Sequence, residues 1–533
     1  LNENLDILTT FKSKPSSFTL PGFGDANKKI KEKLKNSINS DSQEPNGQKQ
    51  TAQTKEPVST TDEIVTGSED TNRELLLDIS ETIFRAYDIR GLAEQQLTDP
   101  VVYAIGLAIG SEALDQGQQH VVVASDGRHS SPRILEALTK GLLASGRDVI
   151  DIGMSPTPLM YFATHEFATH TGVMVTGSHN PAEYNGIKIV IGGRALSGEA
   201  IENLRHRIMN KNLVSGQGSY QTKEIEQSYI DYIINDVAIA QPLKIVIDAG
   251  NGVTGEIAPR LFEELGCDVV PLFCDIDGNF PNHHPDPTIE SNLEELKRKV
   301  IEEQADLGIA FDGDGDRLGV VTASGKFVAA DRLLMLLAQD VVSRNPGADV
   351  IFDVKCTRNL NTLISNYGGR PIMWKTGHSF MKEKMVETGA LLGGEFAGHF
   401  FFKERWFGFD DGMYAAARLI EILSTTDPDL DLQLEAFPES ISSPEIKVMT
   451  GEEQKFSIIE RLVNSGKFDG GKISTLDGIR VDYPDGWGLV RASNTTPMLT
   501  LRFEADTDEA MQRIKSQFKE QLTAVETEIP FNF

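Results

Sequence analysis

The segment KIVIDAGNGVTGEIAPRLFEELGCDVVPLF, residues 244–273, has the pattern of a strand, a helix and a second strand. An apolar, β-branched run ends at Asp248, a polar turn and a helical pattern follow, and Gly266 precedes a second apolar run. Such a unit places its two strands parallel in one sheet and joins them by a right-handed helical crossover.

The same order of features recurs twice. The two further segments, with their matching Asp and Gly, are VVVASDGRHSSPRILEALTKGLLASGRDVIDIG (121–153; Asp126, Gly146) and DVIFDVKCTRNLNTLISNYGGRPIMWKTG (349–377; Asp353, Gly369). The pattern ends at about residue 438. We therefore expect an α/β fold of four domains around a central cleft. Three would be similar α/β domains with mixed sheets, and the last a smaller C-terminal α+β domain.

The expected domains cover residues 76–223, 224–326, 327–438 and 439–533. Residues 1–75 are rich in polar side chains and too poor in apolar ones to repay the entropy of ordering, so we expect a disordered linker or tail. The chain begins at Leu1 rather than Met, which leaves room for an additional domain upstream.

Composition restricts the class of partner. The 533 residues carry a formal net charge of −28, which argues against general binding of nucleic acid or anionic membrane. A small anionic substrate needs only a local basic pocket. No segment has the roughly 18 apolar residues of a membrane span, so we expect no membrane insertion. The three cysteines, Cys267, Cys274 and Cys356, lack metal-ligand spacing and favour a reducing, cytoplasmic location.

The motif FDGDGDR, residues 311–317, places carboxylates at alternate positions, Asp312, Asp314 and Asp316. The two intervening glycines let the backbone turn tightly enough to aim all three at one point. Three hard oxygen ligands suit Mg²⁺, which takes few carboxylates together with a phosphate oxygen. An EF-hand is disfavoured because the downstream Glu and flanking helices are missing. Apolar runs on both sides indicate a loop between two strands.

The motif TGSHNPAEYNGIKIV, residues 176–190, presents Ser178 between Gly177 and His179, ahead of an apolar run. It is not the G-x-S-x-G elbow, so a nucleophilic serine here needs a base or an electrophile polarised by a metal. Taken alone, the segment is more typical of a structural turn. Together with the aspartate loop and the positive charge of Lys188, it indicates phosphoryl transfer to and from Ser178.

Three further motifs carry candidate binding groups. RASNTTP, residues 491–497, offers a guanidinium, hydroxyls and an amide that suit an anion, or it is a capped turn before a strand. GGEFAGHFFFKERWFGFDDG, residues 393–412, offers Glu395 as a sugar-hydroxyl acceptor and His399 as a proton carrier. FRAYDIRG, residues 84–91, brings Tyr87 and Arg90 into one loop.

The segment from Gly250 to Gly255 fits the G-x-G-x-x-G fingerprint of dinucleotide binding, with Asp275 twenty residues further on. The other two repeats lack these glycines. A glycine-rich turn between strand and helix is therefore the favoured interpretation.

Taken together, the loops resemble the α-D-phosphohexomutase family, most closely its bacterial phosphomannomutase/phosphoglucomutase branch. The resemblance covers about residues 76–533 and the family's four-domain fold. The matching motifs, in order, are FRAYDIRG, TGSHNPAEYNGIKIV, FPNHHPDP, DGDGDR, KTGHS, GEFAGH, KERWFGFDDG and VRASNTTP.

The resemblance implies a reversible phosphoryl transfer between C1 and C6 of mannose and glucose phosphates, through a hexose 1,6-bisphosphate that turns end over end. Ser178 would carry the phosphoryl group, and one Mg²⁺ would be held by Asp312, Asp314, Asp316 and a phosphoserine oxygen. Glucose 1,6-bisphosphate would serve as activator. Catalytic roles at the reacting phosphoryl group are implied for Arg90, His179, Lys188, Arg317 and His399. Substrate-binding roles are implied for Tyr87, Lys355, His378, Glu395, Arg491, Ser493, Asn494 and Thr495. Gly177 would leave space for the phosphate.

One departure concerns the sugar loop, where Ala397 replaces the family's usual small polar residue. Three other interpretations stay open on the sequence: phosphoglucosamine mutase, a dinucleotide-dependent oxidoreductase, and a catalytically silent scaffold. The intact Ser178 and metal aspartates weigh against the scaffold.

Overall fold

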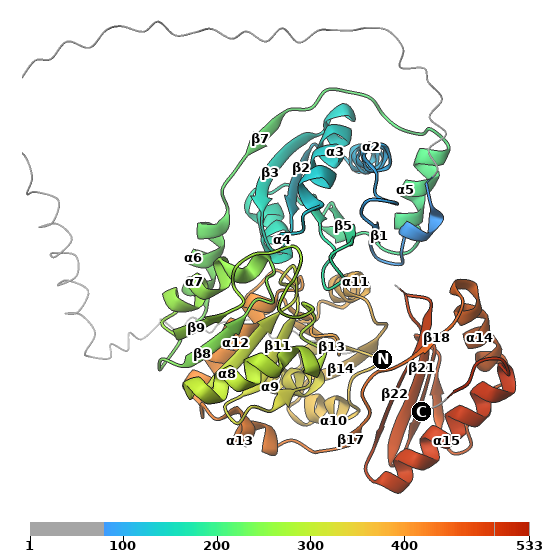
Figure 1. Cartoon of the computed structure of the whole chain (residues 1–533). Helices are drawn as coiled ribbons and strands as arrows, with labels where there is room; N and C mark the ends of the chain where they lie inside the picture. The colour runs from blue at the N-terminus through green and yellow to red at the C-terminus, as the bar shows by residue number, and fades with distance from the viewer. Residues whose placement is uncertain (1–78, 495, 532) are drawn as a thin grey trace, which may run out of the picture. The chain divides into compact units, whose positions relative to one another are not determined.

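The structure is a computed structural model that describes residues 79–494, 496–531 and 533. The tail expected over residues 1–75 and the candidate ligand Thr495 lie outside the described residues. The described chain contains four sheets, and we number the domains by them (Figure 1). The domain boundaries given above stay predictions.

Domain 1 has a mixed sheet in the order β1-β5-β4-β2-β3-β7, with β6 beside β5. Its strands are β1 (Ile89–Leu92), β2 (His120–Ser125), β3 (Asp148–Met154), β4 (Gly172–Val175), β5 (Tyr184–Ile191), β6 (Arg194–Ala195) and β7 (Tyr220–Thr222). Its helices are η1 (Glu81–Ile83), α2 (Asp99–Asp115), α3 (Ser131–Ala144), α4 (Thr157–Glu166) and α5 (Glu199–Met209). Alternate residues of β2 enter different cores: Val121 and Val123 pack with α2 and α3, whereas Val122 packs with α4.

Domain 2 follows α6 (Glu226–Asp236) and has the sheet order β12-β11-β10-β8-β9. Its strands are β8 (Lys244–Asp248), β9 (Asp268–Leu272), β10 (Leu307–Phe311), β11 (Leu318–Thr322) and β12 (Phe327–Val328). Its helices are η2 (Val253–Gly255), α7 (Ile257–Glu264), η3 (Glu290–Leu293) and α8 (Glu294–Glu303). The strands β10 and β11 form an antiparallel hairpin, which confirms that the aspartate motif lies between two strands.

Domain 3 has the sheet order β14-β13-β15-β16. Its strands are β13 (Asp349–Asp353), β14 (Arg370–Trp374), β15 (Leu392–Gly394) and β16 (Phe400–Phe402). Its helices are α9 (Ala330–Arg344), α10 (Asn359–Asn366), α11 (His378–Thr388), α12 (Gly412–Thr425) and α13 (Leu430–Glu435).

The three predicted strand–helix–strand units are confirmed as β2-α3-β3, β8-α7-β9 and β13-α10-β14, each with parallel strands. The aspartate that ends each first strand has the same local role. It accepts a hydrogen bond from the backbone N–H two residues later, at 3.1 Å for Asp126, 2.8 Å for Asp248 and 3.2 Å for Asp353. This repeated turn fixes the direction in which the chain leaves the sheet.

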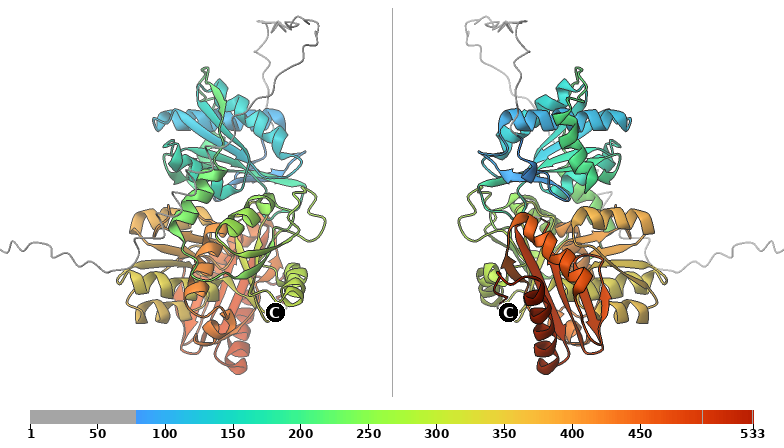
Figure 2. Two further views of the ribbon diagram at one scale, coloured as in Figure 1. Left: turned by 90° about the vertical axis from the view of Figure 1, so that its left-hand side faces the viewer. Right: turned by 90° about the vertical axis from the view of Figure 1, so that its right-hand side faces the viewer.

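Domain 4 has an entirely antiparallel sheet, as the α+β prediction requires. Its strands are β17 (Ile441–Ser442), β18 (Ile446–Met449), β19 (Lys472–Ser474), β20 (Ile479–Tyr483), β21 (Gly486–Ala492) and β22 (Met498–Ala505). Two helices, α14 (Glu452–Ser465) and α15 (Asp508–Val525), cover one face of the sheet (Figure 2).

The cores also separate domain 4 from the rest. One large core runs through domains 1, 2 and 3, whereas domain 4 has its own core around Ile458, Phe503 and Phe518. The apolar link between domains 3 and 4 is a small cluster that contains Val354 and Trp487. Domain 4 is therefore joined to domain 3 by a small apolar patch, together with polar contacts from Arg480 and Arg502 to backbone carbonyls of domain 3.

Candidate functional site

The serine loop joins β4 to β5 in domain 1. Ser178 is buried and has a φ of 50°, a left-handed conformation that is uncommon for a non-glycine residue. Its backbone N–H donates to Thr176 Oγ1 at 2.8 Å. A Cβ on Gly177 would approach the Arg128 guanidinium to 2.5 Å. The glycine is therefore required by Arg128, a reason different from the expected space for a phosphate.

Arg128 fixes the shape of this loop and was not identified from the sequence. Its buried guanidinium donates to four backbone carbonyls, those of Ser178 (2.6 Å), Asn180 (2.7 Å), Pro181 (2.6 Å) and Tyr184 (3.1 Å). The side chain is in turn paired with Asp126 at 3.0 Å. The available signal was the arginine two residues after a strand-ending aspartate.

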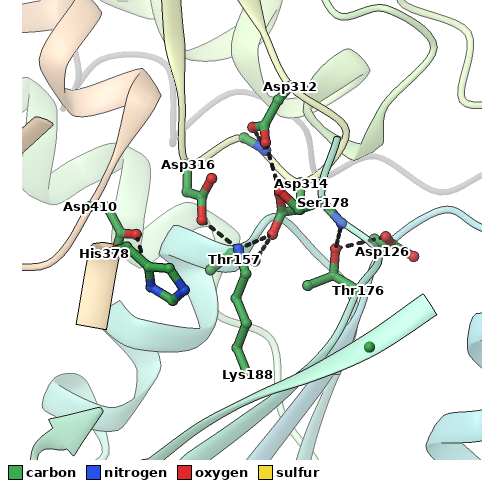
Figure 3. A network of polar contacts seen from close by, with 12 residues as sticks. Asp126, Thr157, Thr176, Ser178, Lys188, Asp312, Asp314, Asp316, His378 and Asp410 are labelled. Carbon is green, nitrogen blue, oxygen red and sulfur yellow. Dashed lines mark hydrogen bonds and ion pairs between the residues drawn. The ribbon is translucent and has the colours of Figure 1, made fainter. Parts of the chain in front are cut away.

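The aspartate loop lies beside Ser178. Asp312, Asp314 and Asp316 are fully buried, and their ligand oxygens lie within 4.8 Å of one another. Ser178 Oγ donates to Asp312 Oδ2 at 3.0 Å (Figure 3). The expected convergence of the three carboxylates next to the serine is thus present.

The donor set suits a divalent cation. Within the described residues, Asp314 Oδ1 is buried and accepts no hydrogen bond, and Asp316 Oδ1 has only the His399 ring beside it, at 3.3 Å. Burial, followed by the charges of Asp316 and Asp314, raises the pKa of Asp312 well above its ordinary value. A bound cation would offset both the crowding of charge and the missing hydrogen bonds. Oxygen ligands of this kind fit Mg²⁺.

Lys188 on β5 reaches the same carboxylates. Its Nζ lies 2.6 Å from Asp314 Oδ2 and also pairs with Asp316 Oδ2. Burial alone would lower the pKa of Lys188, but the two carboxylates outweigh it and raise that pKa. Lys188 is therefore a charged ammonium in this arrangement.

His399 and Glu395 enter from the turn between β15 and β16. The ring nitrogens Nε2 and Nδ1 of His399 lie 3.3 Å from Asp316 Oδ1 and 3.0 Å from Glu395 Oε2. Burial would lower the pKa of His399, but Asp316 outweighs this effect and raises the pKa to about 9. Arg317 Nε lies 3.3 Å from the same Nε2, and its charge opposes this rise in the pKa. The carboxylates of Asp316 and Glu395 thus favour the protonated ring.

Two candidates flank the serine on its other sides. His179 Nδ1 lies 3.2 Å from Ser178 Oγ, and burial together with the charge of Arg317 lowers the pKa of His179 well below its ordinary value. Arg90 donates to Asn180 Oδ1 at 2.6 Å. Among the described atoms, Arg90 Nε is buried without a hydrogen-bond partner. An anion at this position would therefore meet a spare donor.

Tyr87 and His378 lie against each other, with ring centroids 5.1 Å apart in an edge-on arrangement. The backbone N–H of Gly377, just before His378, donates to Glu395 Oε1 at 2.6 Å. The loop before α11 is thereby tied to the sugar loop predicted from the sequence.

The motif RASNTTP, residues 491–497, connects β21 to β22 in domain 4. Its cation, Arg491, therefore comes from a different domain than Ser178. Arg491 Nε is paired with Asp477 at 3.0 Å, and Arg491 Nη2 is buried without a hydrogen bond within the described chain. Ser493 Oγ shares a hydrogen bond with Thr496 Oγ1 at 2.8 Å, and Asn494 follows in the same turn.

Lys355 has a comparable partner, because its Nζ lies 3.0 Å from Glu445 Oε2. Sequence reasoning did not identify Asp477 or Glu445. No short motif marks them, since the pairs form between separate segments.

The glycines from 250 to 255 are explained by packing. A Cβ at Gly252 would lie 2.9 Å from the Gly313 carbonyl oxygen in the aspartate loop. One at Gly255 would collide with the Cys274 carbonyl at 1.9 Å. The chain's own backbone therefore fills the space on which the dinucleotide interpretation depended.

A second cluster adjoins the first. Ligand atoms of Asp316, His399 and Asp410 also lie within 4.8 Å of one another. Asp410 was not identified from the sequence. Its Oδ1 accepts a hydrogen bond from buried Lys382 at 2.7 Å.

None of the helices that the structure describes is both long and apolar enough to cross a membrane. Comparison with known proteins gives a consistent assignment. Four profiles of phosphoglucomutase/phosphomannomutase match in order: the alpha/beta/alpha domains I, II and III at residues 81–214, 227–325 and 329–441, and the C-terminal domain at 445–521.

Curated relatives span the same region. A phosphomannomutase/phosphoglucomutase of Pseudomonas aeruginosa is 58% identical over 452 residues, which are 85% of this chain and 98% of that protein. A phosphoglucomutase of Neisseria gonorrhoeae is 50% identical over 448 residues, 83% of this chain and 97% of that protein.

A solved structure agrees with them. The crystal structure of a phosphoglucomutase/phosphomannomutase family protein from Burkholderia thailandensis matches with a TM-score of 0.80 and 49% identity, over 85% of this chain and 100% of that one. The chain therefore belongs to the phosphoglucomutase/phosphomannomutase family.

Proposed function

We propose that this chain is a phosphomannomutase/phosphoglucomutase. It moves a phosphoryl group reversibly between C1 and C6 of mannose and glucose phosphates, through a phosphoserine at Ser178 and a hexose 1,6-bisphosphate. The contact that carries the proposal is the 3.0 Å hydrogen bond from Ser178 Oγ to Asp312, which unites the candidate nucleophile with the acidic cluster. The names and high identity of the relatives support the same activity.

In the proposed reaction, Asp312, Asp314, Asp316 and a phosphoserine oxygen would hold Mg²⁺. The ion would neutralise charge on the transferring phosphoryl group. The chain supplies the orientation: Arg128 holds the carbonyls of the serine loop so that Oγ stays fixed next to the aspartates. Positioning and electrostatic stabilisation together account for almost all of phosphoryl-transfer catalysis.

The transfer to substrate breaks the bond from phosphorus to Ser178 Oγ and forms one to a sugar hydroxyl oxygen. That hydroxyl loses a proton, and Oγ gains one. His179, whose Nδ1 lies 3.2 Å from Oγ, is placed to exchange the serine proton. Lys188 and His399 are cationic and lie on the aspartates. They therefore act as charge stabilisers or as proton donors rather than as resting bases.

The phosphate that is not reacting would bind to Arg491, Ser493, Asn494 and, outside the described residues, Thr495. Lys355 of domain 3 would add a positive charge to this phosphate site. Glu395 and His378 would form hydrogen bonds with the sugar hydroxyls, and Tyr87 packs against His378. Because the bisphosphate must present first one end and then the other to Ser178, these groups have to accept either phosphate.

Two finer points belong to the same proposal. Glucose 1,6-bisphosphate would activate the enzyme by phosphorylating Ser178 when the phosphoryl group has been lost. The three unpaired cysteines support the expected cytoplasmic location.

The direct test is a coupled assay of glucose 1-phosphate and mannose 1-phosphate, with Mg²⁺ and a trace of glucose 1,6-bisphosphate. We expect turnover of both, which would make Ala397 a tolerated variation. Turnover of neither substrate by folded protein would overturn the proposal. Glucosamine 6-phosphate would be the next substrate to assay.

A further inference from the structure

We infer that Lys382 is a positioning residue that holds His378 in the tautomer with its proton on Nε2. The consequence for catalysis rests on the proposed function, in which His378 reads the sugar. The tautomer itself is a property of the free protein.

Lys382 lies one helical turn after His378 on α11, so the two side chains share a face of the helix. Its Nζ is within hydrogen-bonding distance of three acceptors: Asp410 Oδ1 at 2.7 Å, Tyr161 OH at 2.9 Å and His378 Nδ1 at 3.1 Å. An ammonium has three N–H donors and no acceptor. The three contacts therefore use the whole donor capacity of a side chain that is only 9% exposed.

This contact decides which ring nitrogen of His378 carries hydrogen. Burial lowers the pKa of Lys382, and Asp410 at 2.7 Å offsets part of this effect. As the ammonium paired with Asp410, Lys382 can only donate, so Nδ1 offers its lone pair. The proton of the neutral ring then lies on Nε2. Burial, followed by the charges of Lys382 and Lys188, lowers the pKa of His378 well below its ordinary value, which keeps the ring neutral.

The tautomer of His378 with its proton on Nδ1 fits the observed distances less well. Asp410 Oδ2 lies 3.6 Å from His378 Nδ1, beyond a normal hydrogen bond, although Figure 3 shows the two side chains next to each other. A proton on Nδ1 would also face the Lys382 ammonium at 3.1 Å, so two donors would meet. Asp410 instead serves as the anchor of Lys382.

The result is a free donor on the substrate side of the ring. Among the described atoms, His378 Nε2 is buried without a hydrogen-bond partner. The ring lies between Tyr87 and His399, with centroids at 5.1 and 5.8 Å. With the proton on Nε2, His378 donates to a sugar or phosphate oxygen. With the proton on Nδ1 it would present only an acceptor.

The tautomer can be read by NMR in the substrate-free enzyme labelled with ¹⁵N-histidine. Comparison with the His378→Gln variant identifies the signals of His378 among the 10 histidines. We expect a protonated Nε2 and an unprotonated Nδ1, unchanged between pH 6 and pH 8.5. A protonated Nδ1, or an imidazolium, would overturn the inference without any need for a Lys382 variant.

The variant Lys382→Met, which cannot donate, should mix the two tautomers. Lys384→Met is the matched control, because Lys384 lies on the same helix and contacts Glu387 and Trp374 instead. The Lys384→Met variant should show the same His378 signals as the wild type. Equal spectra for the two lysine variants would contradict the assignment.

Kinetics test whether Lys382 acts through His378. Each of Lys382→Met and His378→Gln should lower kcat/KM for hexose phosphate about tenfold, mainly through KM. The double variant should be no more than about twofold worse than His378→Gln. Multiplied losses of about a hundredfold would overturn the positioning role. An inactive wild-type enzyme with the Nε2–H tautomer present would refute the proposed function while supporting the tautomer.

Discussion

On the proposed function, two loops bind phosphate: the serine loop between β4 and β5, and the phosphate loop, residues 491–497, between β21 and β22. The side chains around these two loops differ in charge. Beside Ser178 three acids are concentrated in one loop: Asp312, Asp314 and Asp316 are fully buried. Lys188 pairs with two of them, and the side chains of His399 and Arg317 lie at the edge of the cluster. Around the phosphate loop the cations Arg491 and Lys355 are each paired with an acid, Asp477 and Glu445 respectively.

The two loops also differ in how firmly their backbones are held. The serine loop is fixed by four hydrogen bonds from buried Arg128, and the strands that it joins contribute Met174 and Val190 to the core shared by domains 1–3. The phosphate loop belongs to domain 4, which has a separate core and a small apolar link. On the proposed function this difference has a clear meaning. A covalent phosphoryl group needs a rigid carrier and a metal, whereas the other phosphate must be released whenever the intermediate turns.

The largest effect should come from removing the carrier. Ser178→Ala leaves the acidic cluster without its nucleophile, so kcat should fall by at least about 10⁴-fold and no phosphoenzyme should form. Turnover and the intact mass after incubation with glucose 1,6-bisphosphate measure both. Ser465→Ala, at an exposed position on α14, is the control. Near-normal turnover by Ser178→Ala would remove the basis of the comparison.

The second effect concerns the acidic side of the comparison. Asp314→Asn removes one ligand charge, so the Mg²⁺ concentration for half-maximal activity should rise about 10- to 100-fold. A Mg²⁺ titration of the initial rate measures it. Asp275→Asn is a matched control on an exposed aspartate of domain 2 and should change nothing. An unchanged metal requirement in Asp314→Asn would contradict the metal loop.

The third effect concerns the cationic side. Arg491→Gln removes a charge-assisted contact, so KM for glucose 1-phosphate should rise roughly 10- to 100-fold. The Mg²⁺ requirement should stay as in the wild type, since Asp312 and its neighbours are untouched. Steady-state kinetics measure both, with Arg513→Gln, an exposed ion pair of the same domain, as control. If KM is unchanged, the second anion site lies elsewhere.

The smallest effect should come from the acid beside Arg491. Asp477→Asn removes the charge that competes with substrate phosphate at 3.0 Å from Nε. KM should therefore fall by about two- to fivefold, and kcat should fall with it if release of the phosphate limits turnover. A rise in KM would show instead that Asp477 serves to orient Arg491.

The sequence was informative wherever a function depends on neighbouring residues. Asp126, Asp248 and Asp353 each act on the backbone two residues on, so their repetition marked three similar domains. The aspartates at alternate positions are likewise brought together by a single hairpin turn. Both patterns are local, and both predictions could be made without a structure.

Contacts between distant segments could not be predicted in this way. Arg128 reaches carbonyls more than 50 residues later, and the Lys188 ammonium is neutralised by aspartates of another domain. Lys382 meets Tyr161 across 221 residues. Such partners depend on how the domains pack, and no motif records that packing.

On the proposed function, the phosphoryl group resides on Ser178 during turnover. Phosphorylation with ³²P-labelled glucose 1,6-bisphosphate, followed by identification of the labelled peptide by mass spectrometry, locates it. We expect one label per chain on Ser178, which unlabelled glucose 1-phosphate removes as hexose phosphate at the rate of turnover. Turnover without a label on Ser178, or a label that substrate does not remove, would contradict it.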